Sequence, residues 1–325
     1  MSTMKAVVIH QAGGPEVLKL ERRPVPTAKP GWVLIRVKAF GLNRSELFTR
    51  QGHSPNVAFP RILGIEAVGE VVEAAHGAFS PGDKVATAMG GMGREFDGGY
   101  AEYTLVPASQ VQKLETSLDW STLGALPEML QTAHGSLHTS LRLQAGQTLL
   151  IRGGTTSVGL AATILAKKID ATVIATTRKP ERRAMLKANG ADHVVIDDGQ
   201  IEGAVRGRFP NGVDRVLELV GTTTLLDSLM ATGRGGAVCM TGMVGDRWEL
   251  ERFSPMGAIP TAVSLTTYAG GAEDFMATPL QDFINVVESG RAKVPSGKVF
   301  TIDEIVEAHR TMEENKAGGK IVMTT

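Results

Sequence analysis

The chain has 325 residues, and at roughly 150 residues per domain this length suggests about two domains. Its 34 basic and 34 acidic side chains cancel, which excludes a global electrostatic attraction to nucleic acid or to an anionic membrane surface. The single cysteine, Cys239, excludes an intrachain disulfide and a cysteine-based zinc site. No signal peptide or membrane span is visible, and we expect a globular, cytoplasmic protein.

The first 110 residues read mostly as short strands separated by tight turns. β-Branched or alternating sequences predict strands at 6–10, 17–21, 32–39, 65–73 and 84–88. The one clear helical stretch, 43–50, begins at Asn43, a residue type that favours the N-cap position. This pattern predicts a β-rich module with a small helix.

From about Leu126 strands begin to alternate with helices of roughly ten residues. Strands are expected at 148–152, 172–176, 194–196, 213–220 and 236–241. One helix is expected to end at Lys168, a second to begin at Pro180 and a third to span 222–231. Helices at 279–289 and 302–314 and a last strand at 320–323 follow. Such alternation is typical of a doubly wound parallel sheet with crossover helices, inserted here into the β-rich module.

A glycine-rich loop follows the strand at 148–152. Gly154 and Gly159 match the first and last glycines of the G-x-G-x-x-G pattern, and Thr156 replaces the middle one. The loop lies between a strand and a helix, where backbone amides can face a pyrophosphate. We therefore predict phosphate binding there, with a plain structural turn as the alternative. The predicted residues are Gly154, Thr155, Thr156, Ser157, Val158 and Gly159.

The second strand of this unit ends in hydroxyl and basic residues. An NAD-selective site would carry a carboxylate there for the ribose 2′-hydroxyl. Hydroxyls and cations suit a 2′-phosphate instead, so the sequence favours NADPH, and a solvated basic helix start is the alternative. The residues expected at the phosphate are Thr177, Arg178, Lys179 and Arg182.

Several segments together resemble the medium-chain dehydrogenase/reductase superfamily, in its zinc-free quinone oxidoreductase-like branch. Besides the glycine loop, they are 4–8, 41–46, 64–69, 81–85, 99–103 and 318–322, and the resemblance covers nearly the whole chain. It implies a GroES-like catalytic domain at 1–125 that 266–325 completes, and a Rossmann NADPH-binding domain at 126–265. It also implies a nicotinamide bound between the two domains and a homodimer.

Departures from the zinc-dependent relatives predict that no metal is bound. Asn43 stands where those relatives have a cysteine, and Ile65 stands where they have a histidine. Glu128 falls roughly at the third ligand position, but one carboxylate cannot hold a catalytic zinc. Phe48 replaces a tyrosine that is common in zinc-free relatives, so no proton donor is inferred from that position.

The resemblance also suggests residues around the reacting groups. Asn43 and Thr132 are expected beside the nicotinamide or the acceptor, and the proton is expected to come from water or from a hydroxyl such as that of Ser45. Capping of the helix by Asn43 and packing of Thr132 inside its helix are the alternatives. Gly242 and Met243 complete the predicted cofactor contacts.

Other residues with chemical potential have plainer interpretations. Glu66 is expected as a buried structural carboxylate that backbone groups or an arginine satisfy. His134 and His138 lie four residues apart without a third ligand, so metal binding is not expected. Cys239 is expected in the core of its strand. Tyr268 is expected to be exposed or packed rather than to line a substrate site.

These features predict a zinc-independent, NADPH-dependent reductase of quinones or α,β-unsaturated carbonyl compounds. Without a Lewis acid, saturated carbonyls are poor hydride acceptors, whereas quinones and enones spread the incoming charge by resonance. A zinc-free alcohol or aldehyde oxidoreductase and a non-catalytic NADPH-binding protein are the alternatives.

Overall fold

The computed structural model describes residues 2–55, 57–74, 77–294 and 296–325. The chain divides into two compact units. Unit 1 comprises Met1–Gln131 and Gly270–Thr325, and unit 2 comprises Thr132–Ala269.

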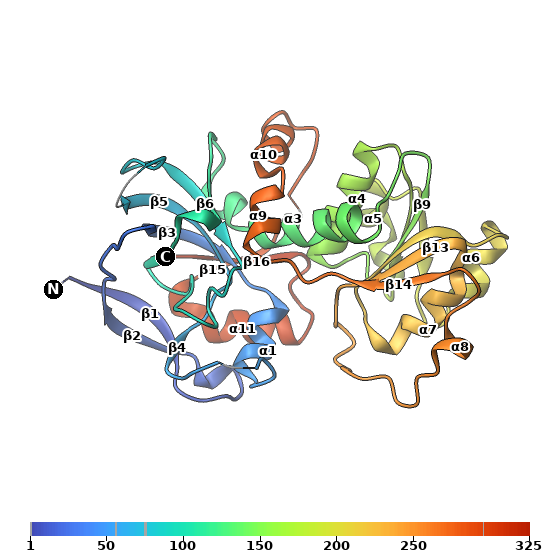
Figure 1. Cartoon of the computed structure of the whole chain (residues 1–325), viewed down its shortest axis with the longest axis horizontal. Helices are drawn as coiled ribbons and strands as arrows, with labels where there is room; N and C mark the ends of the chain where they lie inside the picture. The colour runs from blue at the N-terminus through green and yellow to red at the C-terminus, as the bar shows by residue number, and fades with distance from the viewer. Residues whose placement is uncertain (1, 56, 75–76, 295) are drawn as a thin grey trace. The chain divides into compact units, whose positions relative to one another are not determined.

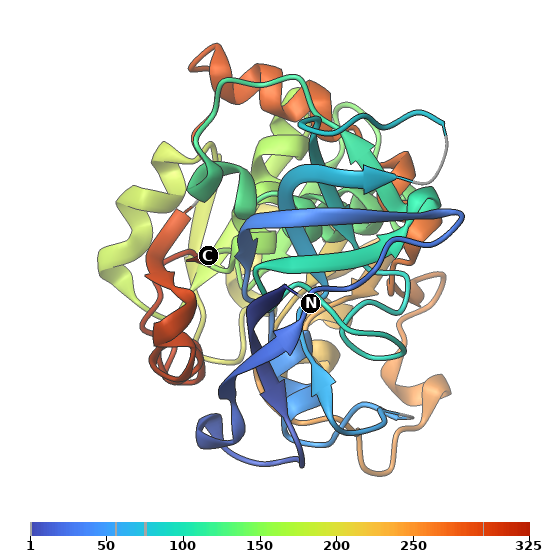
Figure 2. The same ribbon diagram turned by 90° about the vertical axis from the view of Figure 1, so that its left-hand side faces the viewer.

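Unit 1 is rich in β-structure, and Figure 2 gives a view of its strands. Its larger sheet has the order β15-β16-β3-β5-β6-β8, with β7 paired to β3 as well. Its smaller, antiparallel sheet has the order β2-β1-β4. Pairing of β16 with β3 brings the last residues of the chain into a sheet that begins near its start. The strands are β1 (Thr3–Ile9), β2 (Lys19–Pro24), β3 (Trp32–Gly41), β4 (Arg61–Ile62), β5 (Glu66–Ala74), β6 (Lys84–Ala88), β7 (Tyr103–Pro107), β8 (Val111–Lys113), β15 (Ser296–Thr301) and β16 (Lys320–Thr324).

The helices of unit 1 are short, and the longer ones bury one apolar face. In α10 the buried residues Leu280, Phe283 and Ile284 follow the three- and four-residue spacing of a helix face. Helix α3 begins in unit 1 and ends in unit 2. The α-helices are α1 (Arg44–Arg50), α2 (Trp120–Gly124), α3 (Pro127–His134), α9 (Ala272–Ala277), α10 (Leu280–Glu288) and α11 (Ile305–Glu313), and 3₁₀ turns span Pro15–Val17, Ala108–Gln110 and Ile302–Glu304.

Unit 2 is built on a six-stranded sheet in the order β11-β10-β9-β12-β13-β14, and every strand pair is parallel. Figure 1 labels β9, β13 and β14 of this sheet. Its strands are β9 (Thr148–Arg152), β10 (Thr172–Thr177), β11 (His193–Ile196), β12 (Val213–Glu218), β13 (Thr232–Met240) and β14 (Ser264–Thr267). Its α-helices are α4 (Ser157–Lys168), α5 (Arg183–Ala188), α6 (Glu202–Arg208), α7 (Thr222–Ala231) and α8 (Pro255–Ala258). A 3₁₀ turn spans Pro180–Arg182, and a π-helical segment spans Gly135–Ser140. The predicted fold class, a doubly wound parallel sheet inserted in the sequence of a β-rich unit, is confirmed.

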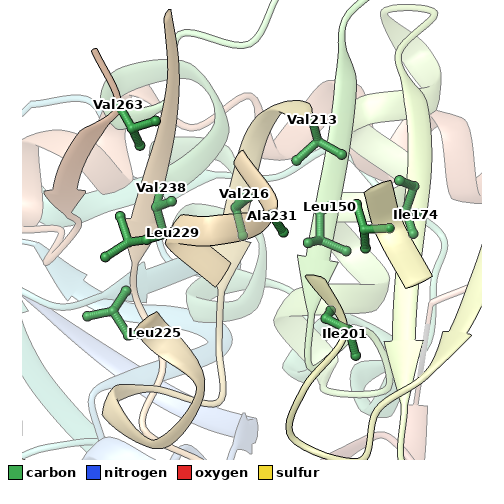
Figure 3. Close-up of a cluster of buried hydrophobic side chains, with 11 residues drawn as sticks. Leu150, Ile174, Ile201, Val213, Val216, Leu225, Leu229, Ala231, Val238 and Val263 are labelled. Carbon is green, nitrogen blue, oxygen red and sulfur yellow. The ribbon is translucent and has the colours of Figure 1, made fainter. Parts of the chain in front are cut away.

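Alternation of side chains along the strands builds the core of unit 2. Leu150, Ile174, Val216 and Val238 point to one face of the sheet, where α6 and α7 cover them (Figure 3). The full cluster is Leu150, Ile174, Ile201, Val205, Val213, Val216, Leu225, Leu229, Ala231, Val238 and Val263. Helix α4 contacts β9 and β10. Crossover helices of this kind keep both faces of a parallel sheet away from water.

The strand order creates a switch point between β9 and β12. The chain passes outward from β9 to β10 and β11 and then returns to β12 on the other side of β9. Ligands of doubly wound sheets bind outside the carboxyl ends of the strands at such a point. Among the described residues, no helix is long and apolar enough to cross a lipid bilayer.

Candidate active site

Asn43 precedes α1, and its side chain belongs to a buried polar cluster rather than to the helix cap. The residue is 7% exposed, and its side-chain amide nitrogen donates to Glu66 Oε1 at 2.9 Å. Its amide oxygen accepts a hydrogen bond from Lys320 Nζ. The helix end is closed from the other side, because Glu46 Oε2 accepts from the Asn43 backbone N–H at 3.0 Å. Asn43 therefore occupies the N-cap position, while its side chain contacts Glu66 and Lys320.

Lys320 is the cation of this cluster, and the first residue of β16 carries it. Its ammonium lies 2.8 Å from Glu66 Oε1 and 3.3 Å from Glu128 Oε2. Burial by itself lowers the pKa of this ammonium, but Glu66 and Glu128 outweigh it and raise the pKa above its usual value. Gly41 leaves room for the pair, since a Cβ there would lie 2.3 Å from Lys320 Cε and 2.4 Å from Glu66 Oε1.

Glu46 is the second buried carboxyl of the cluster. Burial and the neighbouring Glu66 raise its pKa to about 8. At neutral pH Glu46 therefore keeps its proton, which limits the negative charge that Lys320 has to balance. Glu66 accepts from the Glu128 backbone N–H at 2.8 Å as well, so a backbone group satisfies it as expected, and its cation is Lys320 instead of an arginine.

The oxygen atoms of Asn43, Glu66 and Glu128 surround the ammonium of Lys320, and Asn43 and Glu128 stand at two of the metal-ligand positions of zinc-dependent relatives. The third of those positions is Ile65, which offers no ligand atom. In the described part of the chain, no group of three or more His, Cys, Asp or Glu side chains could hold a metal ion. The donor set therefore does not fit a catalytic zinc.

Ser45 lies in the first turn of α1 and is half-buried. Its hydroxyl oxygen accepts a hydrogen bond from Arg94 Nη2. Sequence analysis did not identify Arg94, because it lies in the loop at 89–98, far from α1 in the chain.

Thr132 lies one turn after Glu128 on α3 and is half-buried. The helix continues into the π-helical segment, so His134 and His138 do not lie on one regular α-helix, and the centroids of their rings are 4.5 Å apart. Burial lowers the pKa of both imidazoles. Tyr268 packs on the same segment, because a Cβ on Gly135 would lie 2.0 Å from the Tyr268 ring.

The predicted glycine loop lies at the switch point of unit 2, between β9 and α4. Thr156, which replaces the middle glycine, is the N-cap of α4: its hydroxyl accepts from Gly159 N at 3.0 Å and donates to Gly153 O at 2.9 Å. A Cβ on Gly159 would lie 2.7 Å from Gly153 O, so only glycine fits. The first amides of a helix have no partner within it, and those of Ser157 and Val158 could therefore hold a pyrophosphate.

The predicted 2′-phosphate residues follow β10. Thr177 is buried, and its hydroxyl accepts from Lys179 N at 3.1 Å. Arg178 and Lys179 are exposed, and Arg182 is half-buried at the end of a 3₁₀ turn that Pro180 opens. The cations are thus available to an anion in solution.

Gly242 and Met243 follow the carboxyl end of β13, as the glycine loop follows the carboxyl end of β9. Gly242 N donates to Glu218 O at 3.1 Å, and a Cβ on Gly242 would lie 2.4 Å from Leu219 O. The sulfur of Met243 would lie 3.0 Å from a Cβ on Gly221. Cys239 is fully buried in β13, as predicted.

Arg152, the last residue of β9, forms ion pairs at the carboxyl ends of the strands of unit 2. The sequence patterns did not point to this residue. Its guanidinium is fully buried and makes two hydrogen bonds of 2.9 Å to Asp197, from β9 to the end of β11. It also contacts Asp227 on α7 at 2.5 Å. The sequence carries a signal for this residue, because Arg152 ends an apolar strand directly before two glycines. A cation buried at such a position needs a carboxylate partner, so an ion pair could have been predicted.

Two family descriptions match this chain. Residues 29–116 match the "Alcohol dehydrogenase GroES-like domain" and residues 157–285 match the "Zinc-binding dehydrogenase" family. A quinone oxidoreductase of Pongo abelii is 30% identical over 331 residues, which cover 98% of this chain and 97% of that protein. An acryloyl-coenzyme A reductase of Metallosphaera sedula is 26% identical over 99% of this chain and 100% of its own length. A mycobacterial protein solved in complex with NADPH is 27% identical, with a TM-score of 0.88 over 99% of this chain and 100% of that one.

Proposed function

Since the chain belongs to the medium-chain dehydrogenase/reductase superfamily, in its quinone oxidoreductase-like branch, we propose that it is a zinc-independent, NADPH-dependent reductase of quinones or α,β-unsaturated carbonyl compounds. The similarity to its relatives makes the chain an oxidoreductase of this superfamily. We propose in addition its use of NADPH, its independence of a metal and its acceptor class. A homodimer and a cytoplasmic location stay predictions from the sequence.

One observation carries the proposal: the Lys320 ammonium lies among the oxygens of Asn43, Glu66 and Glu128. A divalent ion at these oxygens would face a buried positive charge, so no Lewis acid is available to polarise a saturated carbonyl, a contribution of several kcal/mol. Quinones and enones place the incoming electron pair on an oxygen through conjugation. Oriented hydrogen-bond donors then suffice to stabilise the product of hydride addition.

NADPH is the proposed hydride source, and when bound it would supply a hydride from its nicotinamide ring. The amides of Ser157 and Val158 would hold its pyrophosphate, beside Gly154, Thr155, Thr156 and Gly159. Thr177, Arg178, Lys179 and Arg182 would hold the 2′-phosphate, and Gly242 and Met243 would line the same strand edge. The acryloyl-coenzyme A reductase relative, named for an activated alkene, supports the acceptor class.

On the acceptor side, we assign catalytic roles to Asn43, Ser45 and Thr132. The Asn43 amide is held by Glu66 and Lys320, so its position is fixed before any ligand arrives. Ser45 and Thr132 are half-buried residues, and we assign their hydroxyls to the acceptor oxygen. Preorganised donors of this kind are effective because they need no rearrangement during the reaction.

The proposal is tested by following NADPH absorbance with a panel of quinones, enones, saturated aldehydes and alcohols. We expect turnover with quinones or enones and little with saturated carbonyls. Turnover limited to alcohols and aldehydes would favour the alcohol oxidoreductase alternative. NADPH binding without turnover of any acceptor would favour the non-catalytic one.

A further inference from the structure

Arg94 is a half-buried cation without a carboxylate partner in the described part of the chain. Its Nε atom is enclosed and has no hydrogen-bond partner among the described residues. The fully buried arginines differ: Arg50 pairs with Glu313, and Arg152 pairs with Asp197. A guanidinium carries five N–H donors and no acceptor, so withdrawing it from water without an anion is unfavourable.

The loop that carries Arg94 is fixed to the strand segment before β5. Met89 N donates to Ile65 O at 2.7 Å, and Gly98 N donates to Ile62 O at 2.8 Å. Between these anchors Gly93 has a φ of +75°, and a Cβ there would lie 2.8 Å from the Gly64 backbone. The loop therefore holds Arg94 in place against the segment that leads into Glu66.

The bond between Arg94 and Ser45 has only one possible direction. Because a guanidinium can only donate, the Ser45 oxygen accepts from Arg94 Nη2. The Ser45 hydroxyl proton is then directed away from Arg94, and it has no acceptor among the described residues. Arg94 thus orients Ser45 as a donor and places a positive charge behind it.

We propose that Arg94 is a positioning residue that, through Ser45, stabilises the oxyanion formed on the acceptor. The inference rests on the proposed function. Hydride addition to the acceptor carbon forms a C–H bond, breaks the conjugated C=C π bond and leaves the electron pair on oxygen as an enolate. A proton from water then completes the saturated ketone of an enone; in a quinone the proton of the new ring C–H bond also moves to the second oxygen, which gives the hydroquinone. NADP⁺ is the oxidised product. The substrate class that follows is a conjugated carbonyl compound whose oxygen, rather than a metal, carries the transferred charge.

The kinetic test compares Arg94→Met, Arg94→Lys and Ser45→Ala with the unaltered protein. Loss of one oriented donor typically costs about 10²–10³ in rate, and we expect Arg94→Met to lower kcat for an enone by that factor without changing the KM for NADPH. Arg94→Lys should recover part of the rate, and the double variant with Ser45→Ala should be little worse than either single variant. The control is Arg44→Met, since Arg44 donates to Asn315 instead of Ser45. Equal rates for Arg94→Met and the unaltered protein would overturn the proposal.

A second measurement does not need turnover. The probe is para-nitrophenol, whose phenolate resembles the oxyanion and is followed by its absorbance. We expect the unaltered protein to lower the pKa of the bound phenol and Arg94→Lys to keep part of this shift. Arg94→Met should lose the shift, while its melting temperature stays close to that of the unaltered protein. No shift with the unaltered protein, or the same shift with Arg94→Met, would overturn the proposal. An Arg94-dependent shift without reduction of any acceptor would instead contradict the proposed function and leave the oxyanion site standing.

Discussion

Lys320 Nζ lies 2.8 Å from Glu66 Oε1, and the two side chains are 1% and 0% exposed. This ion pair joins the last strand of the chain to the start of β5 inside unit 1. Removing one partner of a buried pair leaves the other charge uncompensated, which is far more unfavourable than losing an exposed pair. The pair is therefore a structural requirement of the cluster around Asn43.

Lys320→Met is expected to lower the free energy of unfolding by about 3–5 kcal/mol, because Glu66 and Glu128 lose their cation. Chemical denaturation measures this loss. Lys316→Met is the matched control, since Lys316 pairs with Glu314 at the surface and its loss should change stability little. Similar stabilities for the two variants would contradict the buried ion pair.

Glu46 predicts how stability depends on pH. Its pKa is about 8 in the folded protein against 4.5 for a free carboxyl, with burial and Glu66 as the main causes. Between these values the folded state binds the proton and the unfolded state does not. The contribution of Glu46 to the free energy of unfolding is thus fully present below about pH 4.5 and is lost as the pH rises toward about 8.

Glu46→Gln removes this titration while it keeps a neutral side chain of similar shape. The unfolding free energy of the unaltered protein should fall relative to that of the variant as the pH rises from about 5 to about 8, at most about 1.4 kcal/mol per pH unit. Unfolding curves in denaturant across this range provide the measurement. The exposed Glu249→Gln serves as the control. Parallel pH profiles for Glu46→Gln and the unaltered protein would show that Glu46 does not hold a proton.

Cofactor preference depends on Thr177 and Arg178. Each charge-assisted hydrogen bond to a phosphate contributes roughly 1.5–3 kcal/mol, so two such bonds predict at least a hundredfold preference for NADPH, or about 2.7 kcal/mol. Thr177→Asp with Arg178→Ala should abolish or reverse it. Dissociation constants for both cofactors at moderate salt measure the effect, with the exposed Arg208→Ala as a control. Equal affinities in the unaltered protein would mean that these cations are only a solvated surface.

Ser45→Ala and Thr132→Ala are expected to lower kcat by about 10²–10³, with little change in melting temperature, because both side chains are half-buried. Asn43→Ala should lower both kcat and the melting temperature, since its buried amide contacts Glu66 and Lys320. Steady-state kinetics and thermal melts distinguish these effects. Full activity in Ser45→Ala and Thr132→Ala would remove both residues from the site.

Zinc content gives an independent test of the cluster. Purified protein is expected to contain no stoichiometric zinc and to keep its activity after treatment with a chelator, because Lys320 is bound by the oxygens that a metal would need. Elemental analysis before and after chelation measures this. About one zinc per chain, with activity lost on its removal, would contradict the account.

Local sequence patterns predicted the elements that have strong local signals. The strands at 84–88 and 148–152 and the helix at 222–231 have the predicted bounds, since each is an apolar or well-spaced run between turn residues. Helix α6 was missed because Gly203 and Gly207 give it poor helix propensity. Pro180 opens a 3₁₀ turn before α5 rather than the helix itself.

The chemistry of the site was less predictable, because its contacts join distant parts of the chain. Asn43 and Ser45 could be selected from one motif, and the glycine loop from another. Nothing local to Lys320 shows that it meets Glu66 and Glu128, and nothing local to Arg94 shows that it meets Ser45. Both depend on tertiary pairing, which for Lys320 is the pairing of β16 with β3.

The most direct test of the central claim is the rate of NADPH oxidation by chelator-treated protein with a quinone or an enone as acceptor. The account predicts saturable turnover with such an acceptor, undiminished by chelation and much faster than with a saturated aldehyde. Turnover only with saturated aldehydes or alcohols and only after zinc is added, or no turnover with any quinone or enone, would contradict it.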